Sequence, residues 1–301
     1  MKKLLVLMLG ILLVLGLAGC GSGNDAQDAE ATDANAVTYQ WKFALDETQN
    51  SNQDMLAQVF KQLVEEKSNG AIQLDIYYLG QLGDGDDQGE LIQNGAIDLG
   101  MIATGATGTM VPESNIFGLH YIFPADLAKA KEFLRNSEVI NGQIADAFDA
   151  KNMHVIGWLD EGFMQWTNSV RPITSPEDFK GMKMRVMSAP LITTTYKAYG
   201  ADPVSIPFSE LYSSLSLNMA DGQTNPYEII ENMKFYEVQK YCSEGNSDLY
   251  VAPVVFNKDL WESLPEDIQT LLLEAMQESY ALYDEQHYAA IDKAKAALED
   301  N

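Results

Sequence analysis

An arginine inside a short apolar stretch is the residue of this chain best suited to bind a carboxylate. The stretch reads GMKMRVMSAP over residues 181–190, and its alternation predicts an extended strand. Met184 and Val186 then share one face, while Arg185 points to the other. A guanidinium presents a planar fork that pairs with a carboxylate through two hydrogen bonds, which lysine cannot match. The alternatives are that Arg185 faces solvent or pairs with a structural carboxylate.

The charge balance of the chain gives this arginine a specific use. The 301 residues include 44 acidic and 19 basic side chains, for a formal net charge of −25, and the only arginines are Arg135, Arg171 and Arg185. This balance excludes nucleic acid as a partner, because phosphate backbones are bound by surfaces rich in lysine and arginine. An anionic small molecule would need a local positive anchor, which Arg185 could supply.

The other residues that could do chemistry show no catalytic or metal-binding pattern. The three histidines, at positions 120, 154 and 287, have no metal-ligand spacing. Residues 84–89, DGDDQG, resemble a calcium loop but lack its closing glutamate, so we expect a polar turn. The acidic pair at residues 160–161 lies on a predicted strand and would point to opposite faces. With no nucleophile motif in the sequence, we expect no catalytic residue, no metal, no cofactor and no enzymatic activity.

The N-terminal residues have the composition of a secretion signal. Two lysines precede an apolar run over residues 4–17, which is too short to be a stable membrane span. The run ends in LAGC, which resembles the bacterial lipoprotein signal; this resemblance implies that residues 1–19 are removed and that Cys20 carries lipid. Residues 20–37 are small, polar and acidic, so we expect a flexible tether. The folded body would then be held at the membrane surface, outside the cytoplasm.

The remaining cysteine, Cys242, has no partner in the expected folded body. A single thiol cannot form an internal disulfide. We expect Cys242 to be buried as a small hydrophobic residue.

The elements that must position Arg185 follow from hydrophobic periodicity. An alternating strand at Tyr39–Leu45, a helix through Met55–Val64 and a strand at Ile72–Tyr78 predict a βαβ unit with a parallel pair. Pro265 opens a long helix that reaches about Leu298. Further strands are expected at 96–102, 154–159 and 250–256, with helices at 90–94, 127–135 and within 206–219. The chain therefore reads as an α/β protein of two lobes, with a ligand cleft between them.

Several short motifs follow one another between Trp41 and Glu299. They are GQLG at 80–83, QNGAID at 93–98, TNSVRPI at 167–173, DFKGMKMRV at 178–186, PFSELY at 207–212, ADGQTNP at 220–226, FYEVQK at 235–240 and LPED at 264–267. Their order and spacing resemble the DctP-type solute-binding proteins of tripartite ATP-independent periplasmic (TRAP) transporters.

This resemblance implies a two-lobed, periplasmic-binding-protein-like α/β fold with mixed sheets and a long C-terminal helix that spans both lobes. We expect lobe I to comprise residues 38–161 and 251–290, and lobe II to comprise residues 162–250 and 291–301. Family members usually continue beyond the long helix, which raises the alternative of a truncated C-terminus.

The resemblance also implies the ligand-binding residues. Arg185 would clamp the carboxylate of the ligand, and Phe208 and Asn225 would line the pocket. Asp46 and Thr104 occupy positions where family members often contact ligand. The alternative for Asp46 and Thr104 is a polar loop residue, and for Asn225 it is a turn amide before a proline.

One departure from the family pattern bears on the ligand. Many members carry a second arginine in the stretch that corresponds to GFMQ, residues 162–165, where this chain has Met164 followed by Gln165. We therefore expect these two residues to border a pocket for one carboxylate and an apolar body. Asp46 would then receive hydroxyl groups or an amine.

The sequence thus predicts an extracytoplasmic, lipid-anchored binding protein that captures an organic acid and delivers it to the permease subunits of a TRAP transporter. The alternatives are a solute-binding protein that presents its ligand to a sensor or to an ATP-driven importer.

Overall fold

The computed structural model describes residues 39–300, which form a single contact unit. The signal peptide, Cys20 and the tether expected in residues 1–37 lie outside the described residues. Between residues 39 and 300, none of the helices has both the length and the apolar composition that a bilayer crossing requires.

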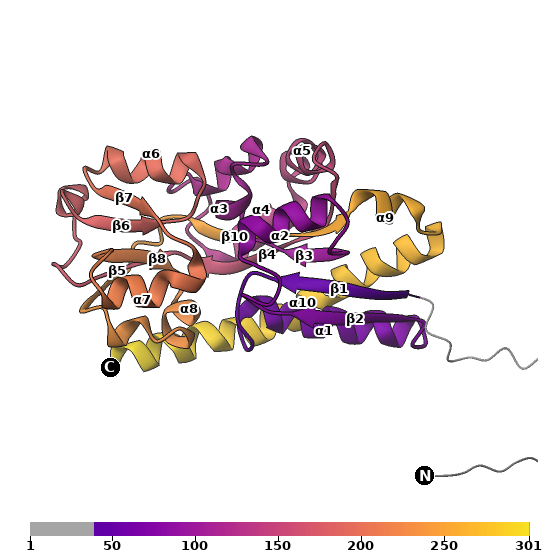
Figure 1. Ribbon diagram of the computed structural model, residues 1–301. Helices are drawn as coiled ribbons and strands as arrows, with labels where there is room; N and C mark the ends of the chain where they lie inside the picture. Colours follow the sequence, from indigo (N-terminus) through magenta and orange to yellow (C-terminus); the bar gives the residue numbers. More distant parts are fainter. Residues whose placement is uncertain (1–38, 301) are drawn as a thin grey trace, which may run out of the picture. The chain divides into compact units, whose positions relative to one another are not determined.

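The elements alternate between strands and helices for most of the chain (Figure 1). The strands are β1 (Tyr39–Leu45), β2 (Ile72–Tyr77), β3 (Leu99–Met101), β4 (Met153–Phe163), β5 (Gln165–Asn168), β6 (Lys183–Val186), β7 (Asp202–Ser205), β8 (Gly222–Asn225), β9 (Tyr241–Ser243) and β10 (Leu249–Asn257). The α-helices are α1 (Asn52–Lys67), α2 (Gly85–Gln93), α3 (Thr104–Thr107), α4 (Leu127–Asn136), α5 (Ala145–Asp149), α6 (Pro190–Ala198), α7 (Leu211–Ser216), α8 (Tyr227–Asn232), α9 (Lys258–Ser263) and α10 (Glu266–Glu299).

The predicted βαβ unit at the start of the fold is confirmed. β1 and β2 pair in parallel from Tyr39 opposite Ile72 onward, and α1 connects them. Ser51 caps α1, because its side-chain oxygen accepts a hydrogen bond of 3.2 Å from the backbone N–H of Asp54. The buried face of α1 carries Leu56 and Phe60, as the helical spacing of the apolar residues requires.

Two mixed sheets organise the described chain. The first has the order β2-β1-β3-β10-β4, with β10 antiparallel to both of its neighbours. The second has the order β7-β6-β8-β5-β9, in which β6 is parallel to β7 and β8. This is the expected mixed two-sheet architecture, and it places the arginine strand β6 in the interior of the second sheet.

The chain passes between the two sheets twice, and the two passages are bonded to each other. β4 gives way to β5 at Met164, and the return passage to β10 runs through residues 244–248. The Met164 N–H donates to the carbonyl of Asp248 at 2.9 Å, and the Ser247 N–H donates to the carbonyl of Met164 at 3.3 Å. The sheets are therefore linked by a paired, two-stranded connection.

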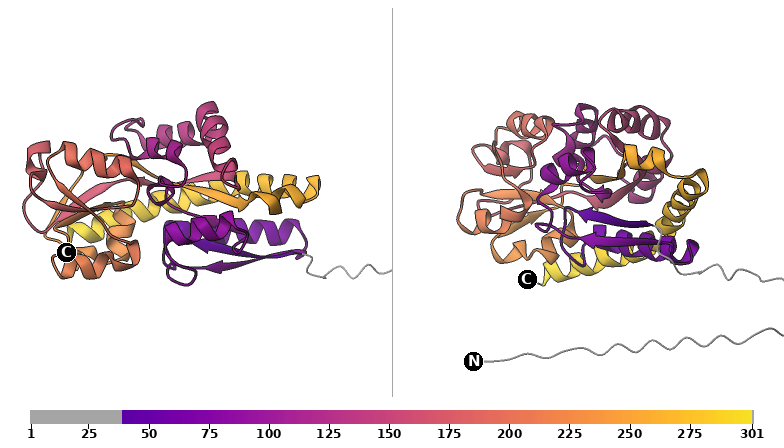
Figure 2. Two further views of the ribbon diagram at one scale, coloured as in Figure 1. Left: turned by 45° about the horizontal axis from the view of Figure 1, so that its top comes forward. Right: turned by 45° about the vertical axis from the view of Figure 1, so that its right-hand side comes forward.

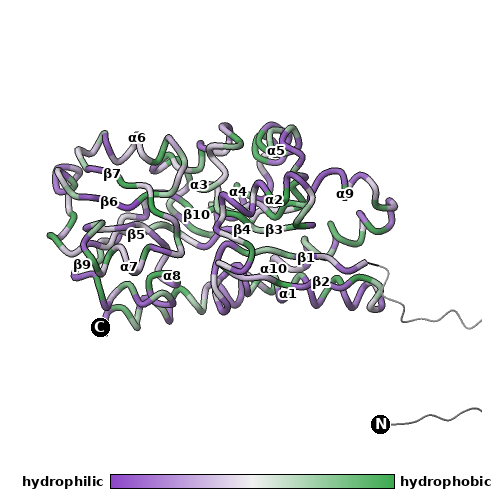
Figure 3. Tube along the Cα trace, in the orientation of Figure 1, coloured by the Kyte–Doolittle hydropathy of each residue, from purple (hydrophilic) through white to green (hydrophobic). Residues whose placement is uncertain are grey.

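Hydrophobic residues fill the space on both sides of the central strands. Every residue of β10 is buried, and hydrophobic colouring follows this strand in Figure 3. Leu99 on the neighbouring strand β3 and Phe43 on β1 are also fully buried. A strand buried along its full length reads as a continuous apolar run, which explains why LYVAPVVF lacks the alternation of a half-exposed strand.

The long helix α10 contacts elements of both sheets. It packs against α1 and β4 on the first sheet and against α8, which follows β8 of the second. The views in Figures 1 and 2 agree that it runs past both sheets. The expectation of a long helix from Pro265 to about Leu298 is confirmed by its bounds, Glu266–Glu299.

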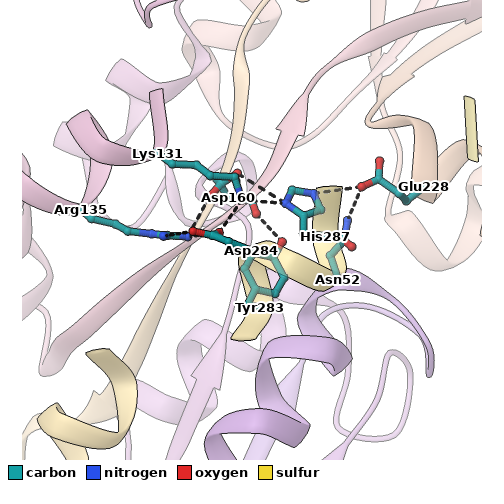
Figure 4. Close-up of polar contacts among 8 residues, drawn as sticks. All are labelled: Asn52, Lys131, Arg135, Asp160, Glu228, Tyr283, Asp284 and His287. Carbon is teal, nitrogen blue, oxygen red and sulfur yellow. Dashed lines mark hydrogen bonds and ion pairs between the residues drawn. The ribbon is translucent and has the colours of Figure 1, made fainter. Parts of the chain in front are cut away.

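A buried charged cluster fixes α10 to its neighbours (Figure 4). Asp284 on α10 accepts hydrogen bonds from Lys131 at 2.7 Å and from both terminal nitrogens of Arg135 at 2.6 and 2.8 Å. The same two cations lie 3.3 and 3.4 Å from the carboxylate of Asp160, a fully buried residue of β4. The Tyr283 hydroxyl donates to the Asp160 carbonyl at 2.6 Å. Two cations thus face two carboxylates, which balances the charge of the cluster.

The cluster continues through a buried histidine to the second sheet. Lys131 donates to Nδ1 of His287 at 2.9 Å, and since an ammonium is only a donor, Nδ1 must be the unprotonated nitrogen. Nε2 of His287 lies 3.0 Å from the carboxylate of Glu228 on α8. Asn52, at the start of α1, also donates to Glu228 at 3.3 Å. Glu228 therefore joins α8 to α10 and α1.

Two expectations for smaller features are wrong. Residues 84–89 do not form a polar turn but begin α2, with Asp84 as its N-cap and Asp86 and Asp87 in its first turn. Carboxylates are favoured there because they face the positive end of the helix dipole. Cys242 is exposed rather than buried, because it lies on β9 at the edge of the second sheet.

We predict that Asp160→Asn destabilises the protein by about 3 kcal/mol, because it leaves the buried Lys131 and the half-buried Arg135 with one carboxylate between them. The measurement is urea unfolding of residues 38–301 at pH 7. Asp146→Asn, at an exposed site, is the control and should change stability by less than about 0.5 kcal/mol. A loss of under about 1 kcal/mol in Asp160→Asn would show that the cluster does not hold α10 in place.

Candidate functional site

A cavity of about 190 Å³ lies between the two sheets, at the end where Arg185 points. Its walls come from the segments after β1 and β6, the start of α2, the segment after β7, and the ends of β8 and β10. Carboxyl ends of parallel strands are the usual place for ligands in open α/β sheets. The amino end of β10 also reaches the cavity, because β10 runs antiparallel to β3.

Arg185 is buried in the wall of this cavity with most of its hydrogen-bonding capacity unused. Its side chain is 4% exposed, and its Nε donates to the carbonyl of Ile206 at 2.9 Å. Within residues 39–300, no carboxylate oxygen lies within 4.0 Å of its guanidinium, whereas Arg135 pairs with two aspartates. Burial lowers the pKa of Arg185 to about 10, and the neighbouring acidic groups only partly oppose this shift. The group stays cationic at neutral pH and lacks a close counter-charge.

Two of the other expected site residues lie beside Arg185. The Phe208 ring centroid lies 5.9 Å from the Arg185 guanidinium carbon, within the range of a cation–π contact. Asn225 is the last residue of β8, is 3% exposed and lines the same cavity. One N–H of its amide nitrogen donates to Gln223, so the second N–H and the oxygen remain for a ligand.

Asp46 lines the opposite wall, but the protein uses both of its carboxylate oxygens. One accepts from the backbone N–H of Ala103 at 2.9 Å, and the other accepts from the side chain of Gln53. Burial raises the pKa of Asp46 to about 6, and these hydrogen bonds limit the increase. The bonds tie the end of β1 to the segment after β3, so Asp46 supports this wall as well as lining it.

The next residue, Glu47, is the better polar contact for a ligand. It lines the cavity, is 3% exposed, and its Oε2 atom has no hydrogen-bond partner among the described residues. Burial, followed by repulsion from the Asp46 carboxylate, raises the pKa of Glu47. Behind it lies Glu161, fully buried with both carboxyl oxygens unpartnered, whose pKa burial and Glu47 raise well above the usual range. Two buried carboxyls in contact cannot both be charged at neutral pH without a nearby cation.

Aspartates at the start of α2 close the edge of the cavity. Ser209 donates to Asp84 at 2.8 Å, and Ser188 donates to Asp86 at 2.8 Å. Both serines belong to the second sheet's part of the chain and both aspartates to the first. These bonds hold the two walls of the cavity together.

The remaining expected site residues lie outside this cavity. Thr104 and Met164 line a second cavity of about 20 Å³, and the Thr104 hydroxyl donates to the carbonyl of Val251 at 3.0 Å. Gln165 lines neither cavity. Its amide nitrogen donates to Asn246 at 2.7 Å, in the return passage between the sheets. Gln165 thus stabilises the paired connection, which sequence position alone could not reveal.

Glu47 and Tyr250 are two of the cavity residues that the sequence reasoning missed. Glu47 directly follows Asp46, so an acidic pair just past the end of a strand was a usable signal. Tyr250 approaches from a strand distant in sequence, and its hydroxyl accepts a hydrogen bond of 3.3 Å from Gln53. No local pattern marks that approach.

Between residues 39 and 300, no group of histidine, cysteine, aspartate and glutamate side chains has an arrangement that could hold a metal ion.

The comparison with known proteins agrees with this geometry. A family model described as bacterial extracellular solute-binding protein, family 7, matches residues 43–301. The ectoine-binding periplasmic protein TeaA of Halomonas elongata is 35% identical over 245 residues, which are 81% of this chain and 71% of TeaA.

Solved structures show the same fold in two states. A TRAP periplasmic solute-binding protein from Desulfovibrio salexigens with bound orotic acid matches with a TM-score of 0.83 at 29% identity, covering 87% of this chain and 83% of that one. TeaA in its apo state matches with a TM-score of 0.75 at 32% identity, with the same coverage. The ligand-bound structure is the better match, in line with the hydrogen bonds that join the cavity walls here.

We predict that the folding stability of Glu47→Gln decreases less than that of the wild type when the pH is raised. A carboxyl whose pKa is raised in the folded state stabilises the protein below its ordinary value of 4.5, and this contribution is lost as pH rises toward about 8. The difference in free energy of unfolding between Glu47→Gln and the wild type should therefore be more favourable to the variant at pH 8 than at pH 5. The change should be about 1.4 kcal/mol for each pKa unit of the shift.

The measurement is urea unfolding of the unliganded protein at both pH values. Glu113→Gln, which removes an exposed carboxylate, is the control and should run parallel to the wild type. A parallel profile for Glu47→Gln would contradict the raised pKa.

Proposed function

Since this chain belongs to the bacterial extracellular solute-binding proteins of family 7, which serve TRAP transporters, we propose that it binds a small zwitterionic organic acid. It would hold the carboxylate at Arg185 and the cationic group at Glu47, and would deliver the acid to the permease subunits of such a transporter. Its relatives are transport binding proteins, so the role of the chain is binding rather than catalysis.

The observation that supports a carboxylate on the ligand is that Arg185 is buried without a carboxylate partner among the described residues. A buried cation costs free energy unless a counter-charge or hydrogen bonds replace its lost water. The terminal nitrogens of Arg185 are left to a ligand, and a carboxylate matches their fork. Phe208 and Asn225 line the same cavity, and the Phe208 ring lies beside the Arg185 guanidinium.

The proposal that the ligand also carries a cationic group rests on the excess of acidic groups around the cavity. Its wall contains Arg185 together with five carboxyl groups, those of Asp46, Glu47, Asp84, Asp86 and Asp87. A dicarboxylate would place its second charge among these acids without a second arginine, at an electrostatic cost. A zwitterion offers a cation to Glu47 instead. Ectoine, which the name of TeaA associates with that protein, is a compact zwitterion of this kind.

The size of the cavity limits the ligand to a small metabolite. Its volume of about 190 Å³ is below the roughly 300–1,000 Å³ of sites for drug-sized molecules. A single compact ring or a short chain fits this volume.

We also propose that Cys20 carries a lipid that holds the protein at the outer face of the cytoplasmic membrane or in the periplasm. The support is the LAGC sequence after an apolar run, followed by a polar acidic segment. An anchored binding protein stays near its permease at a high local concentration.

We predict that ectoine stabilises residues 38–301 in a thermal shift panel and that succinate and galacturonate stabilise them less. A ligand at about a hundredfold over its dissociation constant adds roughly 2.7 kcal/mol to folding stability. Arg185→Lys keeps the charge but loses the fork, so it should weaken binding by about 10- to 100-fold in calorimetry.

The matched control is Arg171→Lys, which lies away from the cavity and donates to the Lys180 carbonyl. If succinate bound more tightly than every zwitterion, the assignment of Glu47 to a cationic group would be wrong. If no acid bound, or if Arg185→Lys bound as well as the wild type, the proposed function would fail.

We predict that Cys20→Ser moves the full-length protein from the membrane fraction to the soluble fraction. An alkyne-tagged fatty acid should label the wild type and not the variant, because the acyl chains attach through Cys20. Cys242→Ser, which leaves this residue intact, is the control. Labelling that persists in Cys20→Ser would contradict the assignment.

A further inference from the structure

Two cavities lie on either side of one methionine. Met187, just after the arginine strand β6, lines both the ligand cavity of about 190 Å³ and the second cavity of about 20 Å³. Ala103 and Tyr250 also line both cavities. Of these three residues, Met187 has the most flexible side chain. It is also the one that comes from the second sheet's part of the chain.

The Met187 side chain packs against Gly105, which has no side chain of its own. A Cβ built on Gly105 would lie 2.4 Å from the Met187 Cε, 2.5 Å from its Sδ and 3.1 Å from its Cβ. Gly105 has no positive φ and belongs to helix α3, so the backbone would accept alanine. The absence of a side chain at this position is thus matched to the thioether packed against it.

The backbone around Met187 is held in place from the other sheet. The Ala189 N–H donates to the carbonyl of Gly105 at 2.9 Å, and the Ser188 hydroxyl donates to Asp86 at 2.8 Å. The thioether is therefore presented at a fixed point between the cavities, while its own torsions stay free to adapt.

The second cavity has features of an extension of the ligand site. Phe117, Ile192 and Leu249 give it apolar walls. Its one charged lining residue among those described is Asp248, whose carboxylate accepts from Ser247 at 2.6 Å and lies 3.7 Å from Nε2 of His120. Its volume is near that of one water molecule, so as it stands it is too small for a ligand group.

We propose that Met187 sets the length of the ligand, because its side chain closes the ligand cavity against the second cavity. The inference rests on the proposed function. Shortening Met187 joins the two cavities and admits ligands that extend past Arg185 toward Asp248. Adding a methyl group at Gly105 pushes the thioether into the ligand cavity and shortens the space available.

The test uses a short probe, γ-aminobutyrate, a long probe, ε-aminohexanoate, and the compact probe ectoine. Calorimetry gives the dissociation constant of each probe with wild type, Met187→Ala, Gly105→Ala and the double variant. Met187→Ala should favour the long probe over the short one by at least about tenfold relative to wild type. Gly105→Ala should weaken ectoine binding by about the same factor, and the double variant should regain it.

A general loss of stability would change the affinities for both chain lengths together, so the ratio of long to short probe isolates the effect of cavity length. Met187→Leu, which keeps the volume, should leave this ratio unchanged. An unchanged ratio in Met187→Ala, with Arg185→Lys still impairing binding, would overturn this inference and leave the proposed function standing. Failure of all probes and all panel acids to bind would overturn both.

Discussion

The structure around the cavity depends on one constraint, which is that a buried guanidinium must have a counter-charge. Arg185 is held by β6 and by one hydrogen bond to the Ile206 carbonyl, and within residues 39–300 it meets no carboxylate at ion-pair distance. The acidic wall lies across the cavity, where burial and then repulsion from neighbouring carboxylates raise the pKa values of Glu47 and of Glu161 behind it. A zwitterion between the two walls relieves both costs at once, whereas a simple anion relieves only the first.

The second constraint is that the two cavity walls must be held by a common support. The cluster of Lys131, Arg135, Asp160 and Asp284 fixes α10 to the first sheet, and His287 with Glu228 carries the connection to α8. Buried ion pairs seldom raise stability above that of an apolar core, but their geometry tolerates few alternatives. Such a cluster suits a helix that has to keep one register against two separate sheets.

The sequence allowed more of the fold to be predicted than of the site. The βαβ unit at the start of the fold and the long C-terminal helix follow from apolar spacing. Arg185 and Phe208 line the cavity at the positions that the family motifs indicated. Gln165 could not be placed, because its partner Asn246 is brought to it only by the paired passages between the sheets. Glu47 lies just past the end of β1, where strand periodicity no longer says which way a side chain points.

The two serine–aspartate hydrogen bonds at the cavity edge have a consequence for timing. Ser209 with Asp84 and Ser188 with Asp86 join walls that belong to different sheets, so the walls cannot separate until both bonds break. Breaking them exposes groups that water can solvate at once, so each bond adds only a modest barrier to opening. The time for which the cavity stays closed on an occupant therefore depends on these bonds as well as on the contacts of the occupant itself.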